Sequence, residues 1–392
     1  MPSIRRTFIL LLACCPLWTG RVAFPQTNPE DEGMSREILD AGVGIYRRAV
    51  ERGEVAGAVL VVARHGRVVL HEAVGWRDIG KRLPMEKDTL FRMASNTKPV
   101  IATAVLMLAE AKKLSLDDHV RKYLPSFDTD RARDIRIKHL LSHTSGMRIQ
   151  DSAGEGVIFF KPLLQKSAEH PDAPSLQAEV ARFGAIGAEK PPGSSYSYSD
   201  PGYNTLGALI EAASGQSLGT FLRDRIYSSL GMVETSNHES KSPNERMAVV
   251  YKGANDGKLA VVWKPGDPPD YPFVRASGGM ITSAADYLRF CRMFLNGGEL
   301  DGKVLLSAES VKAATTPAPN TEHPYRDGLS WYGYGWELFE RGVYGHHGSD
   351  GTFAWVDPKT GVIALVLTQT QRGKGARVQF LKVVEAAVDQ SR

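Results

Sequence analysis

The chain has 392 residues, of which 42% are hydrophobic and 23% are charged, a composition typical of a globular protein. Its formal net charge of +4 is too small to indicate nucleic-acid binding, and the sequence contains no Lys/Arg-rich run that would favour it. The length suits one large domain or two closely packed lobes.

The N-terminus, residues 1–25, has the pattern of an export signal. Arg5 and Arg6 precede an apolar run at 8–18, which is too short to span a bilayer. The same segment resembles a twin-arginine signal and, less closely, a lipoprotein cleavage box. We therefore expect residues 1–25 to be a signal peptide and the protein to be exported, periplasmic or secreted, with no transmembrane segment after the leader.

The first elements after this leader are a helix and a hairpin. Apolar residues recur at helical spacing over 35–51, which predicts an amphipathic helix. Two apolar runs, 58–63 and 68–74, flank a turn at His65-Gly66 and predict a β-hairpin.

The stretch from Val100 to Glu110 is rich in Ala and Leu and lacks Gly, which predicts a helix buried inside the domain. Pro99 is tolerated only in a first turn, so the helix is expected to start at or just before Ser95. Ser95 and Lys98 would then lie one turn apart at the positive end of the helix dipole. A lysine whose pKa is lowered by burial can take the proton of a serine and make it a nucleophile.

The serines of the chain allow two other interpretations. Ser95 could be a helix cap followed by a solvated lysine, but it is the only serine with a lysine three residues later. Ser217 lies in Gly-Gln-Ser-Leu-Gly, which matches the nucleophile elbow of α/β-hydrolases; that elbow requires a strand before the serine. The pattern at 206–213 is helical, so Gly215 is expected to end that helix and Ser217 to cap the next one.

Two segments downstream carry polar groups suited to acyl transfer. In the loop at 196–204, the tyrosine phenols and the Asp200 carboxylate could relay protons if they were held against the Lys98 ammonium. In the segment 344–351, glycines such as Gly348 would let backbone N–H groups approach a ligand, as an oxyanion hole requires.

The adjacent His346 and His347 do not predict a metal site. Neighbouring residues of a strand point to opposite faces, and the chain contains no His-Glu-x-x-His motif or its inverse. Cys291 is aligned with apolar residues at helical spacing over 285–295 and is expected to be a buried thiol without a catalytic role.

The remaining pattern predicts an α+β fold. From the Ser95 helix to about residue 265 we expect loops and short helices, and strands return near the C-terminus. The expected helices are 202–213, 217–230 and 284–296, and the expected strands lie near 332–339, 342–346, 352–357 and 362–369. Strands at both ends with helices between them predict one antiparallel sheet formed from both chain ends, flanked by helices, with an inserted mainly helical lobe.

Three ordered motifs resemble those of the serine β-lactamase and penicillin-binding-protein superfamily: 95–98 (Ser-Asn-Thr-Lys), 198–200 (Tyr-Ser-Asp) and 346–348 (His-His-Gly). They are most similar to the class C-like branch, which includes D,D-peptidases, D-aminopeptidases and family VIII carboxylesterases. The similarity runs from about residue 30 to 390 and includes accessory stretches at 137–146, 276–286 and 296–300.

The resemblance implies the β-lactamase/transpeptidase-like fold and one catalytic domain over residues 26–392. Its α/β lobe would comprise about 30–90 and 270–392, and its helical lobe about 91–269. Lys359-Thr360-Gly361 also matches a motif of this superfamily, but its place in a Pro/Gly turn between two strands argues against a catalytic role.

The resemblance also implies roles for the residues of the site. Ser95 would attack a carbonyl and form an acyl-enzyme, while Lys98 and Tyr198 share the proton transfers and water releases the acyl group. The backbone N–H groups of Ser95 and Ser349 would form the oxyanion hole. The predicted substrate-binding residues are Asp200, His346 and Gly348. No cofactor or metal is implied.

Two positions depart from the family pattern. Asp200 stands where the family usually has Asn, and an ionised carboxylate offers acceptors only. It would also favour the charged form of Lys98 and leave more of the base role to Tyr198. His346 stands where the lactamases have Lys, so the fixed positive charge that would hold a substrate carboxylate is weakened.

We therefore expect a secreted serine hydrolase that acts on a small-molecule ester, amide or peptide. The alternatives are a D,D-carboxypeptidase, a D-aminopeptidase or a weak class C-like β-lactamase. The non-enzyme alternative is a catalytically silent penicillin-binding-type module, and the sequence leaves the oligomeric state open.

Overall fold

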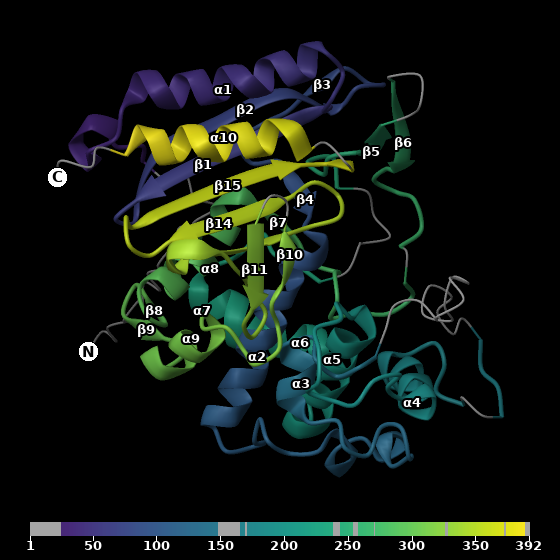
Figure 1. Cartoon of the computed structure of the whole chain (residues 1–392). Coiled ribbons are helices and arrows are strands. Elements are labelled where there is room, and N and C mark those ends of the chain that lie inside the picture. Colours follow the sequence, from purple (N-terminus) through teal and green to yellow (C-terminus); the bar gives the residue numbers. More distant parts are fainter. Residues whose placement is uncertain are drawn as a thin grey trace, which may run out of the picture.

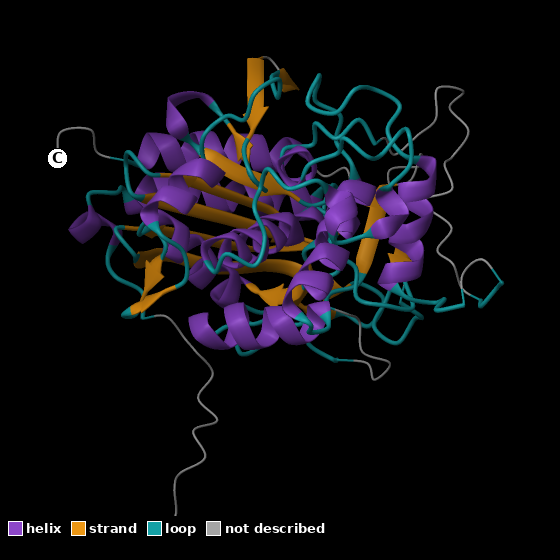
Figure 2. Cartoon of the chain, turned by 90° about the horizontal axis from the view of Figure 1, so that it is seen from below, coloured by secondary structure: helices purple, strands orange, loops and turns teal. Residues whose placement is uncertain are grey.

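The computed structural model describes residues 25–147, 165–168, 171–237, 244–253, 258–269, 271–325, 328–371 and 374–388. A large sheet carries helices on both faces, and a mainly helical region lies beside it (Figure 1). Seen from below, the strands run between helices (Figure 2). None of the helices in these described ranges is long and apolar enough to cross a membrane.

The main sheet is built from both ends of the chain, as the sequence predicts. Its strand order is β10-β11-β12-β13-β14-β15-β1-β2-β3, and neighbouring strands are antiparallel. The two chain ends meet where β1 pairs with β15, in a register that sets Ala58 opposite Thr368. The strands are β1 (Gly57–Arg64), β2 (Arg67–Asp78), β3 (Leu83–Pro84), β10 (His323–Tyr325), β11 (Gly328–Tyr332), β12 (Glu337–Leu338), β13 (Tyr344–His347), β14 (Phe353–Asp357) and β15 (Val362–Thr368).

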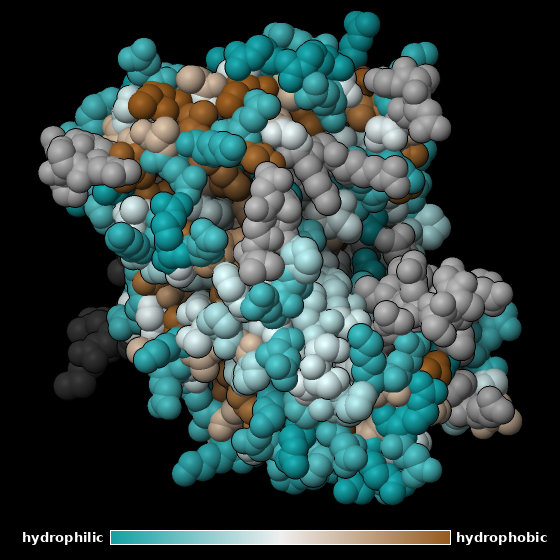
Figure 3. Space-filling model, viewed as in Figure 1, coloured by the Kyte–Doolittle hydropathy of each residue, from teal (hydrophilic) through white to brown (hydrophobic). Residues whose placement is uncertain are grey.

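Helices cover both faces of this sheet, so every residue of β1 and β15 is buried. On one face, α1 (Arg36–Glu51) and α10 (Lys374–Ala387) lie side by side (Figure 1). Between these helices the rings of Tyr46 and Phe380 meet edge-on. On this side of the molecule, apolar surface gathers around these two helices, whereas the helical region is mainly hydrophilic (Figure 3). On the other face, α8 (Ala284–Leu295) packs against β14 and β15 and buries Cys291 completely, which confirms its predicted place in the core.

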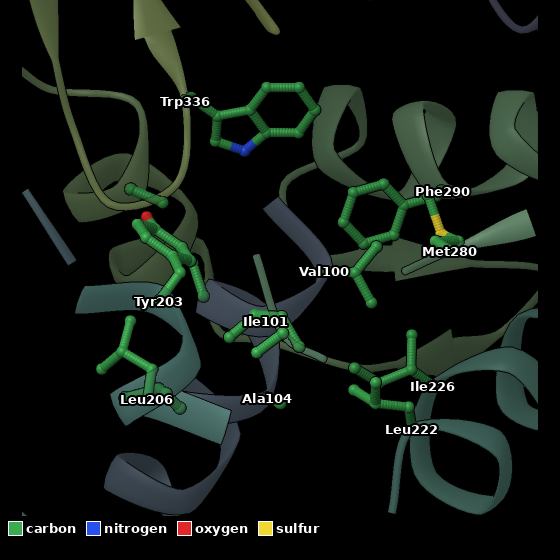
Figure 4. Close-up of a cluster of buried hydrophobic side chains, with 14 of the residues drawn as sticks. Val100, Ile101, Ala104, Tyr203, Leu206, Leu222, Ile226, Met280, Phe290 and Trp336 are labelled. Carbon is green, nitrogen blue, oxygen red and sulfur yellow. The ribbon is translucent and has the colours of Figure 1, made fainter. Parts of the chain in front are cut away.

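The helical region is organised around α2 (Thr97–Glu110), in which every residue from Thr97 to Leu106 is buried. Val100, Ile101 and Ala104 of α2 lie among side chains from several other elements (Figure 4). The neighbouring helices are α3 (Ile137–Leu141), α4 (Leu176–Ile186), α5 (Asp200–Ser214), α6 (Leu218–Leu222), the π-helical turn η6 (Arg223–Tyr227), α7 (Ser228–Leu230) and α9 (Ala308–Ala314). The short 3-10 turns are η1 (Pro29–Glu32), η2 (Ala94–Asn96), η3 (Val120–Lys122), η4 (Pro125–Phe127) and η7 (Glu340–Gly342).

Several predicted elements differ from the structure. The strand expected at 332–339 is two strands, β11 and β12, because the chain turns between them at Gly335, whose φ is 88°. Strands also occur within the stretch expected to hold only loops and helices, and neither α10 nor the β10–β11 hairpin was predicted. The smaller sheets comprise β4 (Leu90–Arg92) with β7 (Ile281–Ser283), β5 (Val250–Gly253) with β6 (Leu259–Trp263) and β16 (Thr370–Gln371), and β8 (Glu299–Leu300) with β9 (Lys303–Val304).

Two motifs that match catalytic motifs of known enzymes, at 215–219 and 359–361, lie where the sequence predicts. Gly215 ends α5 with a φ of 71°, and the Ser217 hydroxyl accepts the Thr220 N–H at 3.3 Å at the start of α6. Lys359 and Thr360 form the turn between β14 and β15, where both backbone N–H groups face the Asp357 carboxylate. Both motifs are therefore structural.

Candidate active site

Ser95 lies in the 3-10 turn η2, directly before α2, and not in the α-helix itself. Ala94 has a φ of 46°, in the left-handed region that residues other than glycine rarely adopt. Thr97 holds the turn: its hydroxyl donates to the Ala94 carbonyl at 2.7 Å and accepts the Met280 N–H at 3.0 Å. The turn presents the partly exposed Ser95 side chain from an otherwise buried segment.

Lys98 lies one turn after the serine, as the sequence predicts, and is fully buried. Its Nζ lies 3.1 Å from Ser95 Oγ, 2.6 Å from Asp200 Oδ1 and 2.8 Å from the Ser277 carbonyl oxygen. Burial lowers the pKa of Lys98, and the Asp200 carboxylate opposes this effect without reversing it. Asp200 thus favours the charged form of Lys98, as expected, but burial has the larger effect. The pKa of Lys98 is lowered overall, which is the direction that a lysine base requires.

Asp200 is placed by the N-terminus of α5, where it is the first helical residue. The preceding residue, Ser199, caps the helix because its Oγ accepts the Gly202 N–H at 3.0 Å. The Asp200 side chain is 38% exposed, so its carboxylate connects the buried Lys98 to solvent.

The Ser277 carbonyl is itself held in place from α5. Asn204 Oδ1 accepts the N–H groups of Ala276 at 3.1 Å and Ser277 at 3.0 Å. This buried amide thus aligns the backbone that accepts a hydrogen bond from Lys98. Neither Asn204 nor Ser277 was predicted to have a role, although both belong to the motif stretches at 196–204 and 276–286.

Tyr198 packs beside the same lysine, with Lys98 Nζ 4.6 Å from the centre of the phenol ring. Burial raises the pKa of Tyr198 well above its ordinary value; the Asp200 charge raises it further, and contact with Ser95 lowers it. The hydroxyl is buried and makes no hydrogen bond of standard geometry with the described residues. Tyr198 is therefore a neutral phenol at the nucleophile whose proton is not committed to another acceptor.

His346 lies beside the rings of Tyr198 and Tyr332 and is fully buried. Its Nδ1 donates to the His347 carbonyl at 2.8 Å, and its Nε2 lies 2.9 Å from the Tyr332 hydroxyl. Burial lowers the pKa of His346 to about 3, so the imidazole is neutral at pH 7. With both nitrogens occupied, it offers neither a charge nor a free donor to a substrate in this conformation.

His347 faces the buried carboxylate of Glu337, which was not predicted from the sequence. Its Nδ1 lies 2.9 Å from Glu337 Oε2, and its side chain remains 35% exposed. Burial would raise the pKa of Glu337, but the neighbouring histidines, His347 first, bring it below its ordinary value. The carboxylate is therefore ionised beside the last residue of β13.

The end of β13 is pressed against the turn that carries the nucleophile. A Cβ added to Gly348 would lie 2.5 Å from the Met93 carbonyl oxygen and 3.3 Å from the Ala94 Cβ, so only glycine fits. This contact brings the exposed Ser349 next to η2, where the Ser95 N–H lacks an intrahelical acceptor. The two predicted oxyanion-hole amides therefore belong to adjoining segments.

The chain is similar to known proteins over most of its length. It matches the family model described as Beta-lactamase over residues 44–387, which include the whole site. It is 32% identical to penicillin-binding protein 4 of Amycolatopsis lactamdurans over 331 residues, covering 80% of this chain and 81% of that protein. It is 30% identical to esterase EstB of Burkholderia gladioli over 369 residues, covering 85% and 90%. Among solved structures, EstCE1, a hydrolase with promiscuous acyltransferase activity, has a TM-score of 0.74 at 23% identity, covering 90% of this chain and 99% of that one.

Proposed function

Because the chain belongs to the β-lactamase family of serine hydrolases, we propose that it cleaves esters and small amides through an acyl-enzyme formed on Ser95. One observation carries this proposal. The buried Lys98 Nζ lies 3.1 Å from Ser95 Oγ and is held there by two groups that can only accept hydrogen bonds, a carboxylate and a carbonyl.

The partners of Lys98 fit a neutral amine, which has two N–H donors and one lone pair. In that form two N–H groups would donate to Asp200 Oδ1 and the Ser277 carbonyl oxygen, and the lone pair would accept the Ser95 hydroxyl proton across the 3.1 Å contact between Nζ and Oγ. Because burial lowers the pKa of Lys98, this form is more accessible than it is for an exposed lysine. We therefore assign the acylation base to Lys98.

Tyr198 completes the proton transfers as an acid. Its raised pKa keeps it a phenol, which gives its proton to the leaving oxygen or nitrogen and regains one from the Lys98 ammonium. The N–H groups of Ser95 and Ser349 would stabilise the negative oxygen of the tetrahedral intermediate. Water then attacks the acyl-enzyme, releases the acid and returns the proton to Ser95.

The substrate class follows from what the site offers. Asp200 provides acceptors where an amide donor would bind a substrate carbonyl, and His346 is neutral and buried where a cation would bind a carboxylate. A short ester needs neither group. The 30% identity to a protein named esterase EstB supports this assignment, while the similarity to a penicillin-binding protein supports D-amino-acid peptides as the alternative.

We further propose that the enzyme acts outside the cytoplasm, because residues 1–25 have the pattern of a signal peptide. These residues lie, except for the last, outside the described part of the chain. Mass spectrometry of the mature N-terminus from the native host tests this proposal. An intact N-terminus in the cytoplasmic fraction would contradict it.

The hydrolase assignment is tested by intact-mass labelling with a fluorophosphonate, followed by peptide mapping and ester turnover. We expect one label, on Ser95, together with hydrolysis of p-nitrophenyl butyrate. Labelling without turnover of an ester, a cephalosporin or a D-Ala-D-Ala peptide would favour a silent penicillin-binding-type module.

A further inference from the structure

His143 occupies a special place beside the site, in the turn that follows α3. Its side chain is fully buried, and its backbone has a φ of 58°, in the left-handed region. Histidine is among the few non-glycine residues that are enriched in that region. His143 belongs to the accessory stretch 137–146, and its sequence pattern predicted no role for it.

The backbone on both sides of Tyr198 is hydrogen-bonded to this one residue. The Ser197 N–H donates to the His143 carbonyl oxygen at 2.8 Å, and the Ser199 N–H donates to His143 Nδ1 at 3.0 Å. Tyr198 stands between these two donors. Its backbone position is therefore set by His143 from both directions.

The imidazole also contacts the phenol directly. The ring centres of His143 and Tyr198 are 4.3 Å apart, with the planes tilted by 36°. Because Nδ1 accepts a backbone N–H, the proton of the neutral ring resides on Nε2. A proton on Nδ1 would point at the Ser199 N–H and break that bond.

The surroundings keep the ring in its neutral form. Burial lowers the pKa of His143 well below its ordinary value, and Lys98 from α2, His346 from β13 and His323 from β10 lower it further. The phenols of Tyr196, Tyr203 and Tyr332 complete its aromatic surroundings. The acceptor at Nδ1 is therefore present at neutral pH.

We propose that His143 is the positioning residue for Tyr198: its carbonyl, its Nδ1 and its ring together aim the Tyr198 hydroxyl at Ser95. This inference rests on the proposed function, because it presumes that Tyr198 transfers a proton during turnover. His143 does not itself take part in the chemistry; it acts only through the placement of Tyr198. Misplacing a catalytic group by about 1 Å can cost on the order of 10² in rate.

Two substitutions of similar polarity distinguish the effect of losing the Nδ1 acceptor from the effect of losing the rest of the histidine side chain. In His143→Asn, the amide oxygen takes the place of Nδ1, and asparagine also tolerates a positive φ. In His143→Gln, the amide reaches the place of Nε2, and the Ser199 N–H loses its acceptor. We expect kcat on p-nitrophenyl butyrate to stay within about fivefold for Asn and to fall by about 10- to 100-fold for Gln, with KM changed less than about threefold.

The matched control is His139→Gln, four residues earlier in α3. His139 Nδ1 also accepts a backbone N–H, from Arg136 at 3.2 Å, but this bond closes the start of the helix, away from Tyr198. We expect its kcat to equal that of the wild type. If His139→Gln slows turnover as much as His143→Gln does, the effect is one of general structure and the proposal fails.

A double-mutant cycle with Tyr198→Phe decides how His143 acts. If it acts only through the Tyr198 hydroxyl, His143→Gln costs less than about twofold once that hydroxyl is absent. An equal cost in both backgrounds overturns the positioning role, even when both proteins fold. A Tyr198→Phe enzyme with full activity would instead overturn the proton transfer in the proposed function, so the two failures are distinguishable.

Discussion

Lys98 Nζ lies 2.6 Å from Asp200 Oδ1, in a pair whose lysine is fully buried and whose carboxylate side chain is 38% exposed. The pair joins α2 to the N-terminus of α5 and sets two effects against each other. Burial lowers the pKa of Lys98, and the carboxylate raises it. The balance between these effects determines the pH at which the proposed base becomes active.

Replacing Asp200 by Asn should therefore move the pH profile of the enzyme. Asn removes the charge that raises the pKa of Lys98, so the neutral amine forms at lower pH. We expect the rising limb of log kcat/KM for a butyrate ester to shift toward acid in Asp200→Asn. The measurement is kcat/KM from pH 5 to pH 10 in buffers of constant ionic strength.

The control for this profile is Asp128→Asn. Asp128 forms an ion pair with Arg121 at 3.0 Å, and both side chains are well exposed. Its profile should overlay that of the wild type. A shift of the Asp200→Asn limb toward alkali would show that Lys98 does not act as the base in acylation.

Ser95→Ala should abolish ester turnover and fluorophosphonate labelling, because no other described serine has its hydroxyl hydrogen-bonded to a buried lysine. Ser217→Ala is the matched comparison, since Ser217 caps α6 and lies at the surface. It should keep full activity and lose about 1 kcal/mol of unfolding free energy, the usual contribution of a helix cap. Retained labelling of Ser95→Ala would contradict the assignment of the nucleophile.

Glu337→Gln should destabilise the protein in a pH-dependent way. The folded-state pKa of Glu337 is lowered, so its contribution is present above the unfolded-state value and is lost as pH falls through the folded-state value. We expect a loss of about 1–3 kcal/mol at pH 7, typical of a broken hydrogen bond to a charged group. Urea unfolding at pH 7 and at pH 4 tests this; a loss that is no smaller at pH 4 would contradict it.

The sequence predicted those parts of the fold that depend on local pattern. The period-3.6 runs became α1 and α8, the stretch rich in Ala and Leu became α2, and the apolar strands at both chain ends became one sheet. The break at Gly335 was not predictable from the strand pattern, because it depends on close packing against α2. A Cβ at that position would lie 2.6 Å from the Cβ of Ala102.

The catalytic motifs could be predicted because each carries its chemistry within a few residues. Their supporting residues could not. Ser277 is 179 positions from the lysine whose Nζ it binds, and His143 is 56 positions from the Ser199 N–H that it accepts. Such contacts leave no pattern of spacing, so only the folded arrangement reveals them. The net direction of the Lys98 pKa likewise depends on burial, which its motif does not specify.

The last prediction concerns the choice between esters and β-lactams. A penicillin presents an amide side chain and a carboxylate, which are best bound by an amide donor and a cation. Here Asp200 is engaged with Lys98, and His346 is neutral with both nitrogens occupied. A buried polar group left unpaired costs about 1–3 kcal/mol, and a lost charge-assisted bond costs a similar amount.

Together these costs correspond to about 10²–10³ in kcat/KM, so we expect slow or no turnover of β-lactams beside measurable hydrolysis of short acyl esters. The test is kcat/KM for p-nitrophenyl butyrate, a cephalosporin and a D-Ala-D-Ala peptide on one preparation. Asp200→Asn should reduce the difference in kcat/KM between the ester and the cephalosporin, because it restores an amide donor at that position. A cephalosporin value above that of the ester in the wild type would show that neither residue disfavours β-lactams.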